Sequence, residues 1–210
     1  YQDTGWLGDG IACSKYVSGV GTNFTSLAIA AAYNCGIRDF DVQQGYEAAL
    51  KNEVEWRGRL EGAGKMDVRQ FVERGYSPYE KRFDMVTREE GSGFGASHTM
   101  EYSFSSFAVS QFAKHLGKED DYRYFLNRAL SYQTLIDPET KYMRGKDSQG
   151  NWRTPFTPVA YQGPGSVNGW GDITEGFTVQ YTWYVPQDVQ GYMNELAKIG
   201  SATGWMNCSQ

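Results

Sequence analysis

Histidine and cysteine are scarce in this sequence. Its 210 residues include only two histidines, His98 and His115, and three cysteines, Cys13, Cys35 and Cys208. With so few histidines and no Cys-x-x-Cys pair, a zinc site or a Ser-His-Asp triad built within this chain is disfavoured. In a secreted chain an odd number of cysteines leaves at least one free or paired with another chain, and Cys13 with Cys35 is a candidate bridge.

Long basic runs and long apolar runs are also missing. The net charge is −5 and the isoelectric point is about 5.1, a balance that disfavours nucleic acid as a partner. No apolar run approaches the roughly 20 residues that a membrane-spanning helix needs. We therefore expect neither a nucleic-acid partner nor a membrane span.

Aromatic residues, by contrast, are plentiful, with 15 Tyr, 11 Phe and 6 Trp. This composition is common in proteins that handle carbohydrates, although a Tyr-rich core would explain it equally well. Two glycosylation triplets, beginning at Asn23 and Asn207, are candidate sites for N-linked glycans. Together these features favour a secreted or extracellular protein.

Hydrophobic spacing predicts a mostly helical chain of helical hairpins with long loops. Glycine or proline closes most of the helices, and Asp39 or Asp41 caps the second one. The predicted helices span about 22–35, 42–55, 66–73, 97–116, 119–137 and 187–199.

The clearest helix begins after Ser97, a good N-cap, and ends before Gly117. Apolar residues recur along it at spacings of three and four, as expected for a helix. The next helix opens with an acidic turn at Glu119 after a very short link, so the two form an antiparallel hairpin. The apolar positions of the first helix are Met100, Phe104, Phe107, Ala108, Phe112 and Leu116.

A single acid, Glu175, follows a glycine-rich loop at 163–171 and comes just before a predicted helix. Aromatic and amide side chains follow it within two to three turns. Such a setting suits a neutral, hydroxyl-rich ligand, because sugars present CH faces to rings and hydroxyls to amides and carboxylates. Alternatively, Thr174 or Asp172 caps a helix and the aromatics form core. The residues following the acid are Gln180, Tyr181, Trp183 and Tyr184.

Three motifs around this acid resemble the signature of glycoside hydrolase family 92, the calcium-dependent exo-acting α-mannosidases. They are Thr174-Glu-Gly176, Gln180-Tyr-Thr-Trp183 and Val185-Pro-Gln-Asp188. The resemblance runs in order from about Gly36 to Gly191. Its other blocks are Gly36-Ile-Arg-Asp-Phe-Asp41, Gly75-Tyr-Ser-Pro78, Ser97-His-Thr-Met-Glu-Tyr102, Asp137-Pro-Glu-Thr140 and Tyr142-Met-Arg-Gly145.

The resemblance implies an (α/α)6 toroid, a fold of two concentric rings of helices. The predicted helices amount to about half of such a toroid. Residues 1–210 are therefore expected to be part of a single glycoside hydrolase catalytic domain, truncated at both ends. A half-ring leaves an apolar edge exposed, so we expect further residues or another chain to complete the domain.

The resemblance also implies a reaction, the hydrolysis of terminal α-linked mannose with inversion on an α-mannoside or N-glycan substrate. Glu175 would be the general acid. The family's general base lies downstream, and we find no counterpart before Gln210. The implied calcium would be held by ligands outside this chain.

Three further residues are candidate substrate contacts. Gln180 could support the sugar or the acid, or be an exposed helix amide. Trp170 could stack on a sugar, or anchor the glycine-rich loop. Glu101 matches a Glu of the family near the sugar pocket, or merely complements the dipole of a helix first turn.

Two positions depart from the family pattern. Phe177 stands where the family usually has a small polar residue, and Gln187 where it usually has histidine. Both changes remove polar contacts near the expected pocket. They leave open a non-catalytic mannoside-binding or structural glycoprotein on the same scaffold, or another (α/α)6 hydrolase or lyase.

Overall fold

The computed structural model describes residues 1–2, 4–8, 10–12, 15–17, 23–60, 62–80, 94–161, 172–174 and 176–202. These residues are mainly helical, as predicted, with one antiparallel hairpin of β1 (Gly10–Ala12) and β2 (Lys15–Val17). The helices are α1 (Thr25–Asn34), α2 (Val42–Val54), α3 (Val68–Arg74), α4 (Gly95–His115), α5 (Glu119–Arg128), the 3-10 helix η1 (Ser131–Leu135), α6 (Thr178–Tyr181) and α7 (Val189–Ala202).

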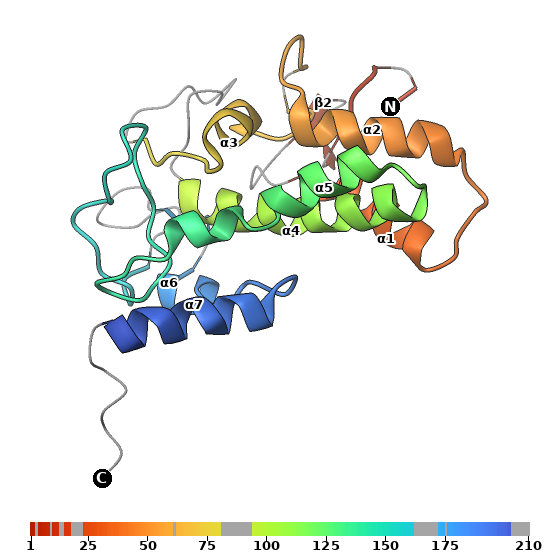
Figure 1. Cartoon of the computed structure of the whole chain (residues 1–210). Coiled ribbons are helices and arrows are strands. Elements are labelled where there is room, and N and C mark those ends of the chain that lie inside the picture. Colours follow the sequence, from red (N-terminus) through yellow and green to blue (C-terminus); the bar gives the residue numbers. More distant parts are fainter. Residues whose placement is uncertain are drawn as a thin grey trace.

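Helix α4 lies at the centre of the fold (Figure 1). It packs against α1, α2, α5 and η1, and the predicted antiparallel hairpin of α4 and α5 is confirmed. The helix that the apolar spacing predicts is confirmed. Of its 21 residues, 15 are buried, because neighbours surround the helix, although Phe104 and Phe107 are only partly buried. Its buried serines are small enough to let those neighbours approach closely.

Glycine ends three of the described helices as predicted, at Gly36, Gly75 and Gly117. After α1, Gly36 adopts φ +90°. The Gly36 amide donates to the Tyr33 carbonyl at 3.0 Å, and the Ile37 amide donates to the Ala32 carbonyl at 3.0 Å. This pair of bonds is a Schellman motif, which satisfies carbonyls that the helix leaves open. The same pattern closes α4 at Gly117, whose φ is +70°.

Acidic residues cap the starts of two other helices. Asp41 Oδ1 accepts from the Gln44 amide at 2.9 Å and begins α2. Asp188 Oδ1 accepts from the Gly191 amide at 3.1 Å and begins α7, beyond the predicted break at Pro186. Two predicted ends were wrong: α5 stops at Arg128 and gives way to η1, and α7 continues to Ala202. Helix ends are set by capping and packing, which apolar spacing does not report.

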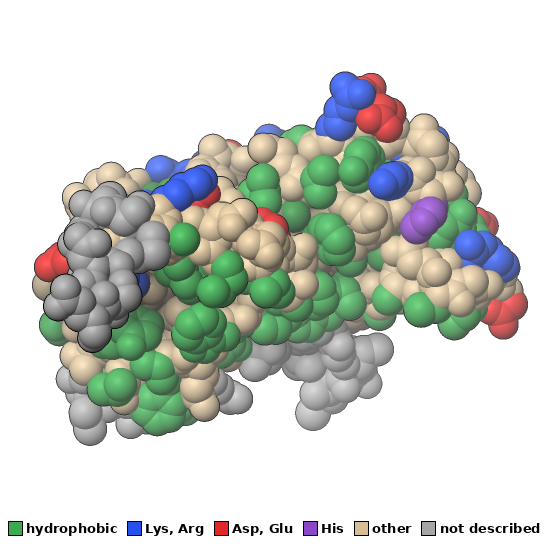
Figure 2. All heavy atoms as spheres, turned by 60° about the horizontal axis from the view of Figure 1, so that its bottom comes forward, with side chains coloured by type: hydrophobic (Ala, Val, Ile, Leu, Met, Phe, Trp, Pro, Cys, Tyr) green, Lys and Arg blue, Asp and Glu red, His purple; other side chains and the backbone are tan. Residues whose placement is uncertain are grey.

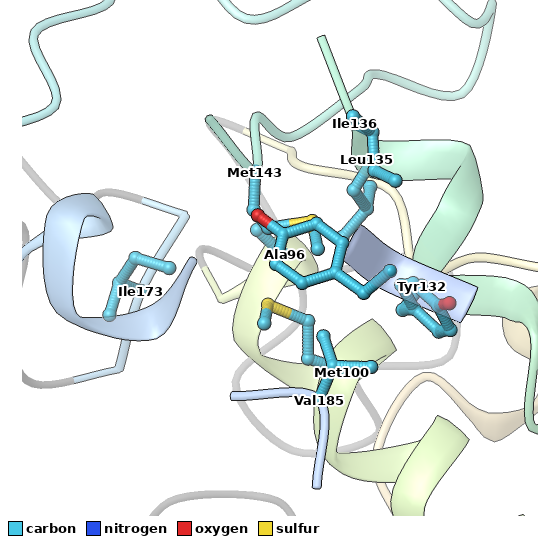
Figure 3. Packing of buried hydrophobic residues seen from close by; sticks show 9 residues of the cluster. Ala96, Met100, Tyr132, Leu135, Ile136, Met143, Ile173 and Val185 are labelled. Atoms are coloured by element: carbon cyan, nitrogen blue, oxygen red, sulfur yellow. The ribbon is translucent and has the colours of Figure 1, made fainter. Parts of the chain in front are cut away.

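A hydrophobic cluster joins α4 to the C-terminal third of the described chain. Figure 3 shows Met100 of α4, Met143 and Val185 among side chains that come from separate segments. Ile173 belongs to the same cluster and is fully buried. The cluster therefore holds the segment that contains Ile173 to the N-terminal half of α4.

The opposite side of α4 contacts a buried ionic cluster. Lys65 Nζ lies 2.5 Å from Glu53 Oε1, and the two side chains are 1% and 0% exposed. Ser105 of α4 bonds to both partners. Arg128 of α5 donates to the Glu53 carbonyl at 3.0 Å, and Ser26 of α1 donates to Glu53 Oε1 at 2.5 Å. Glu53 of α2 thus joins four helices, α1 and α4 through its carboxylate and α5 through its backbone carbonyl.

The charges in this cluster decide the protonation of Glu53. Burial alone raises the pKa of a carboxyl, but the charges of Lys65 and Arg128 outweigh that effect and hold the pKa of Glu53 below its ordinary value. The carboxylate is therefore ionised at neutral pH and needs its cation.

In the described residues, no helix is both long enough and apolar enough to cross a membrane.

We predict that Lys65→Met strongly destabilises the fold. Removing one partner of a buried pair leaves an uncompensated charge and costs about 3–5 kcal/mol. The midpoint of thermal unfolding of the full-length protein measures the effect. Lys198→Met is the control, because Lys198 pairs with Glu195 on the surface and is 70% exposed. Equal midpoints for the two variants would contradict the role given to the cluster.

Candidate active site

The segment 172–174 is buried and is clamped to the first turn of α4. The Ser97 amide donates to the Asp172 carbonyl at 3.0 Å. The Thr174 amide donates to Ser97 Oγ at 3.1 Å, and the two hydroxyls lie 3.0 Å apart. Three hydrogen bonds to one serine therefore set the position of the chain immediately before residue 175.

Ser97 was predicted to be the N-cap of α4, and this prediction was wrong. Helix α4 begins at Gly95, so Ser97 lies within its first turn. The alternative in which Thr174 or Asp172 caps a helix is also wrong. Helix α6 begins at Thr178, and the Gln180 side chain accepts from the Phe177 amide at 3.1 Å. Asp172 and Thr174 instead serve the clamp to α4.

Three of the predicted site residues, Glu175, Trp170 and Asn207, lie outside the described residues. Their roles stay predictions. The described neighbours of Glu175 are Thr174, which is held by the clamp, and Gly176, which has φ +137°.

Asp172 has an unusual environment for a carboxyl. It is 1% exposed, and burial raises its pKa to about 6, although the Arg153 charge opposes the shift. The Gly145 amide donates to its Oδ2 at 3.2 Å. A Cβ on Gly145 would lie 2.4 Å from Asp172 Oδ1, so only glycine fits beside this carboxyl. The close packing fixes the start of the clamped segment.

Glu101 lies one turn after Ser97 on the same side of α4. It is 7% exposed, and the Tyr181 hydroxyl donates to its Oε1 at 3.5 Å. Burial raises the pKa of Glu101 to about 7, against the opposing effects of Tyr184 and His98. The alternative that it complements a helix first turn is wrong, because α4 starts six residues earlier, at Gly95. Glu101 is thus a buried carboxyl that is neutral below about pH 7.

The aromatic and amide residues after Glu175 divide into two groups. Tyr181 and Tyr184 are partly buried, lie 6.0 Å apart by ring centroid, and adjoin Glu101. Trp183 is 66% exposed. Gln180 is also exposed, and its oxygen caps α6. The structure therefore brings the two tyrosines to Glu101 but does not bring Trp183 or Gln180 there.

The residues that depart from the family pattern have structural contacts. Gln187 donates to the Ala129 carbonyl at 3.3 Å, which joins the start of α7 to the end of α5. Phe177 packs edge-on against Tyr161 with 6.0 Å between ring centroids.

A buried pair beside the site was missed by sequence reasoning. His98 Nδ1 lies 2.6 Å from Asp67 Oδ2, and both side chains are 0% exposed. The two residues are far apart in sequence, so no local pattern relates them. The His98 ring also stacks on Tyr102 at 5.5 Å between centroids. The pair anchors the start of α3 to α4.

The first predicted glycosylation site lies in the interior. Asn23 is 0% exposed, and its Nδ2 donates to the carbonyls of Leu7 at 3.1 Å and Gly64 at 2.9 Å. An N-linked sugar on this nitrogen would have no room and would break both bonds, so the geometry argues against a glycan at Asn23.

Cys35 is exposed and has no disulfide partner among the described residues, while Cys13 and Cys208 lie outside them.

The chain matches the model of a glycoside hydrolase catalytic domain over residues 1–200. It belongs to glycosyl hydrolase family 92. The predicted family resemblance is thus confirmed.

Solved structures of family 92 share this fold. The family 92 α-mannosidase of Bacteroides thetaiotaomicron in complex with mannoimidazole is 51% identical, has a TM-score of 0.72, and is matched over 86% of this chain and 22% of its own. A family 92 inverting mannosidase from the same bacterium is 25% identical with a TM-score of 0.73, over 92% of this chain and 24% of its own. The helices are accordingly a partial (α/α)6 toroid, as predicted.

A curated relative from Arthroderma benhamiae, described as an uncharacterized secreted glycosidase, is 34% identical over 158 residues. That match covers 70% of this chain and 19% of the relative. The chain therefore spans about a quarter or less of the length of the relatives it matches.

We predict that Glu101→Gln removes a pH-dependent penalty on stability. Because the folded pKa of about 7 lies above the ordinary value of 4.5, Glu101 makes the protein less stable as pH rises between these values. The variant lacks this loss. The difference between its unfolding midpoint and that of wild type should increase as the pH is raised from about 4.5 to about 7, and should stay constant above that pH.

Thermal unfolding of the full-length protein across this pH range checks the prediction. Glu139→Gln is the control, because Glu139 is exposed. If the two variants show the same pH dependence, the environment inferred for Glu101 is wrong.

Proposed function

We propose that the protein is an exo-acting α-mannosidase that hydrolyses terminal α-linked mannose with inversion, and that Glu175 is its general acid. The observation that carries the proposal is the clamp of Thr174 to Ser97 beside Glu101, within a chain that is 51% identical to an α-mannosidase bound to mannoimidazole. The clamp holds the residue before the acid in a defined place. Proton transfer requires such positioning.

Inverting hydrolysis needs two carboxyl groups at roughly 6.5–9.5 Å, one to protonate the leaving oxygen and one to activate water. We assign the first role to Glu175. Glu101 suits the second role poorly, because its pKa of about 7 keeps it neutral in mildly acidic solution. We therefore place the general base outside this chain, as the family resemblance implies.

A neutral carboxyl can donate a hydrogen bond, and we assign Glu101 to substrate binding on this ground. It would hold a sugar hydroxyl together with the phenols of Tyr181 and Tyr184. We also propose Gln180 and Trp170 as substrate contacts, Gln180 through its amide nitrogen and Trp170 by stacking on a sugar ring.

Calcium is part of the proposal only through the family resemblance. Among the described residues, no group of three or more His, Cys, Asp or Glu could hold a metal ion. These residues therefore do not fit a calcium site, and we place the ligands outside this chain.

We propose that residues 1–210 are part of one catalytic domain, truncated at both ends, and that further residues or another chain complete it. Figure 2 shows hydrophobic side chains gathered over one face. Large apolar side chains near the C-terminal end of the described chain are exposed, namely Trp183, Val189 and Met193. A monomer seldom leaves such side chains uncovered together.

The substrate that we propose is an α-mannoside, free or within an N-glycan. We further propose that the protein acts outside the cell in carbohydrate metabolism and carries a glycan at Asn207. The relative from Arthroderma benhamiae, described as secreted, supports the location.

We predict that Glu175→Gln in the full-length protein lowers kcat by about 10²–10⁴ on a mannobiose substrate, because a general acid contributes that much. The loss should be much smaller on 2,4-dinitrophenyl α-mannoside, whose leaving group needs little protonation. Glu139→Gln is the matched control.

Equal losses on both substrates would contradict the general-acid role. Binding of mannobiose without turnover by the wild-type protein would favour the alternative, a mannoside-binding or structural glycoprotein. Loss of activity with a chelator and its recovery with calcium would support the calcium dependence that the family resemblance implies.

We predict that Ser97→Ala lowers kcat about tenfold with little change in KM, because the residue before the acid loses its clamp. Ser110→Ala is the matched control. Both serines are buried on α4, and both donate to the carbonyl three residues earlier, Ser97 at 3.0 Å and Ser110 at 2.7 Å. Kinetics on mannobiose, whose leaving group needs protonation, test the prediction, and equal kcat values for the two variants would contradict it.

A further inference from the structure

A pocket of about 520 Å³ lies beside the turn at 147–150, away from Glu101. Its volume falls within the roughly 300–1,000 Å³ typical of sites for small ligands. Two aromatic rings, two carboxylates and several amide and hydroxyl side chains line it. The lining includes Tyr79, Glu80, Asp147, Gln149, Trp152 and Arg153.

The turn that forms this pocket is rigid. Asp147 Oδ1 accepts from the amides of Gln149 and Asn151, each at 2.9 Å. The Tyr76 hydroxyl donates to the Asp147 carbonyl at 2.8 Å. Arg74 of α3 donates to the Ser148 carbonyl at 2.9 Å. A wall already held in place loses little entropy when a ligand binds.

The charges in the pocket favour a neutral ligand. Arg153 is a cation in the lining, but its Nε lies 3.7 Å from the carboxylate of Asp172. Glu80 and Asp147 add negative charge. Among the lining residues two carboxylates stand against one cation, a balance that disfavours a phosphate or other anion, whereas hydroxyl groups can bond to the amides and carboxylates.

The rings in the pocket suit sugars. Lys146 Nζ lies 4.1 Å from the centroid of the Trp152 ring and orders the indole. Arg153 lies 5.0 Å from the centroid of the Tyr79 ring. Half-buried rings beside amides offer both surfaces that a saccharide needs, an apolar one for its CH faces and a polar one for its hydroxyls.

The pocket is close to the proposed general acid along the chain. Arg153 lines the pocket and pairs with Asp172, which precedes Glu175 by three residues. Three residues of extended chain span at most about 11 Å. The wall of the pocket and the segment that leads to Glu175 are therefore linked by one ion pair.

We propose that this pocket is a second saccharide-binding site, which holds a sugar unit of the substrate beyond the terminal mannose. The proposal rests on the proposed mannosidase function. It assigns Trp152 as the ring on which that sugar packs and Gln149 as a hydrogen-bond partner at the rim.

Trp152→Ala in the full-length protein tests the proposal. The ratio of kcat/KM for an α-linked mannotriose to kcat/KM for 4-nitrophenyl α-mannoside should fall about tenfold, or ~1.4 kcal/mol, through KM. Gln149→Ala should lower the same ratio less. Its side chain is exposed, so it tests the proposal even if Trp152→Ala does not fold.

Trp56→Ala is the matched control. Trp56 is also half-buried and has a cation over its ring, Arg57 at 4.4 Å, but it does not line the pocket. The ratio of kcat/KM for mannotriose to kcat/KM for the aryl mannoside should be the same in Trp56→Ala as in wild type. An unchanged ratio in both pocket variants, or equal losses on both substrates, would overturn the proposal.

Failure of the proposed function gives a different result, because wild type would then hydrolyse neither substrate. In that case calorimetric titration with mannotriose decides the matter. Weaker binding to Trp152→Ala than to Trp56→Ala supports the pocket, and equal binding to both overturns it.

Discussion

The fold depends on one carboxylate that is removed from water, Glu53. Its partner Lys65 is 1% exposed, and neither charge can remain buried without the other. The pair requires α2 and the chain before α3 to approach each other. Ser26 and Arg128 bring α1 and α5 to the same point. An apolar core tolerates small shifts between helices, but a buried ion pair with fixed hydrogen bonds does not.

Helix α4 carries this constraint to the candidate site. Ser105 bonds to the ion pair, and Ser97, two turns earlier, clamps the segment before Glu175. Glu101 lies between them. Burial raises the pKa of Glu101, and the charge of Lys65 offsets part of that rise. Because one rigid helix holds all three residues, the site and the ionic cluster keep a fixed separation.

Local chemistry made several features predictable. Glycine adopts the positive φ of a helix end without strain, so glycines that follow an apolar periodic run marked three ends correctly, at Gly36, Gly75 and Gly117. The link between α4 and α5 is so short that the two helices can only pack antiparallel. The ordered motifs around Glu175 identified the family, because they depend on residue identity and order and not on contacts.

The sequence by itself determined the helical class, the hairpin of α4 and α5, and the family. Only the tertiary structure decided which carboxyls are buried, that Ser97 clamps Thr174, and that Asn23 is enclosed. Burial and long-range hydrogen bonds join residues that are far apart along the chain, and spacing within one helix carries no information about them. The raised pKa of Glu101 arises in this way, since it depends on what surrounds the side chain.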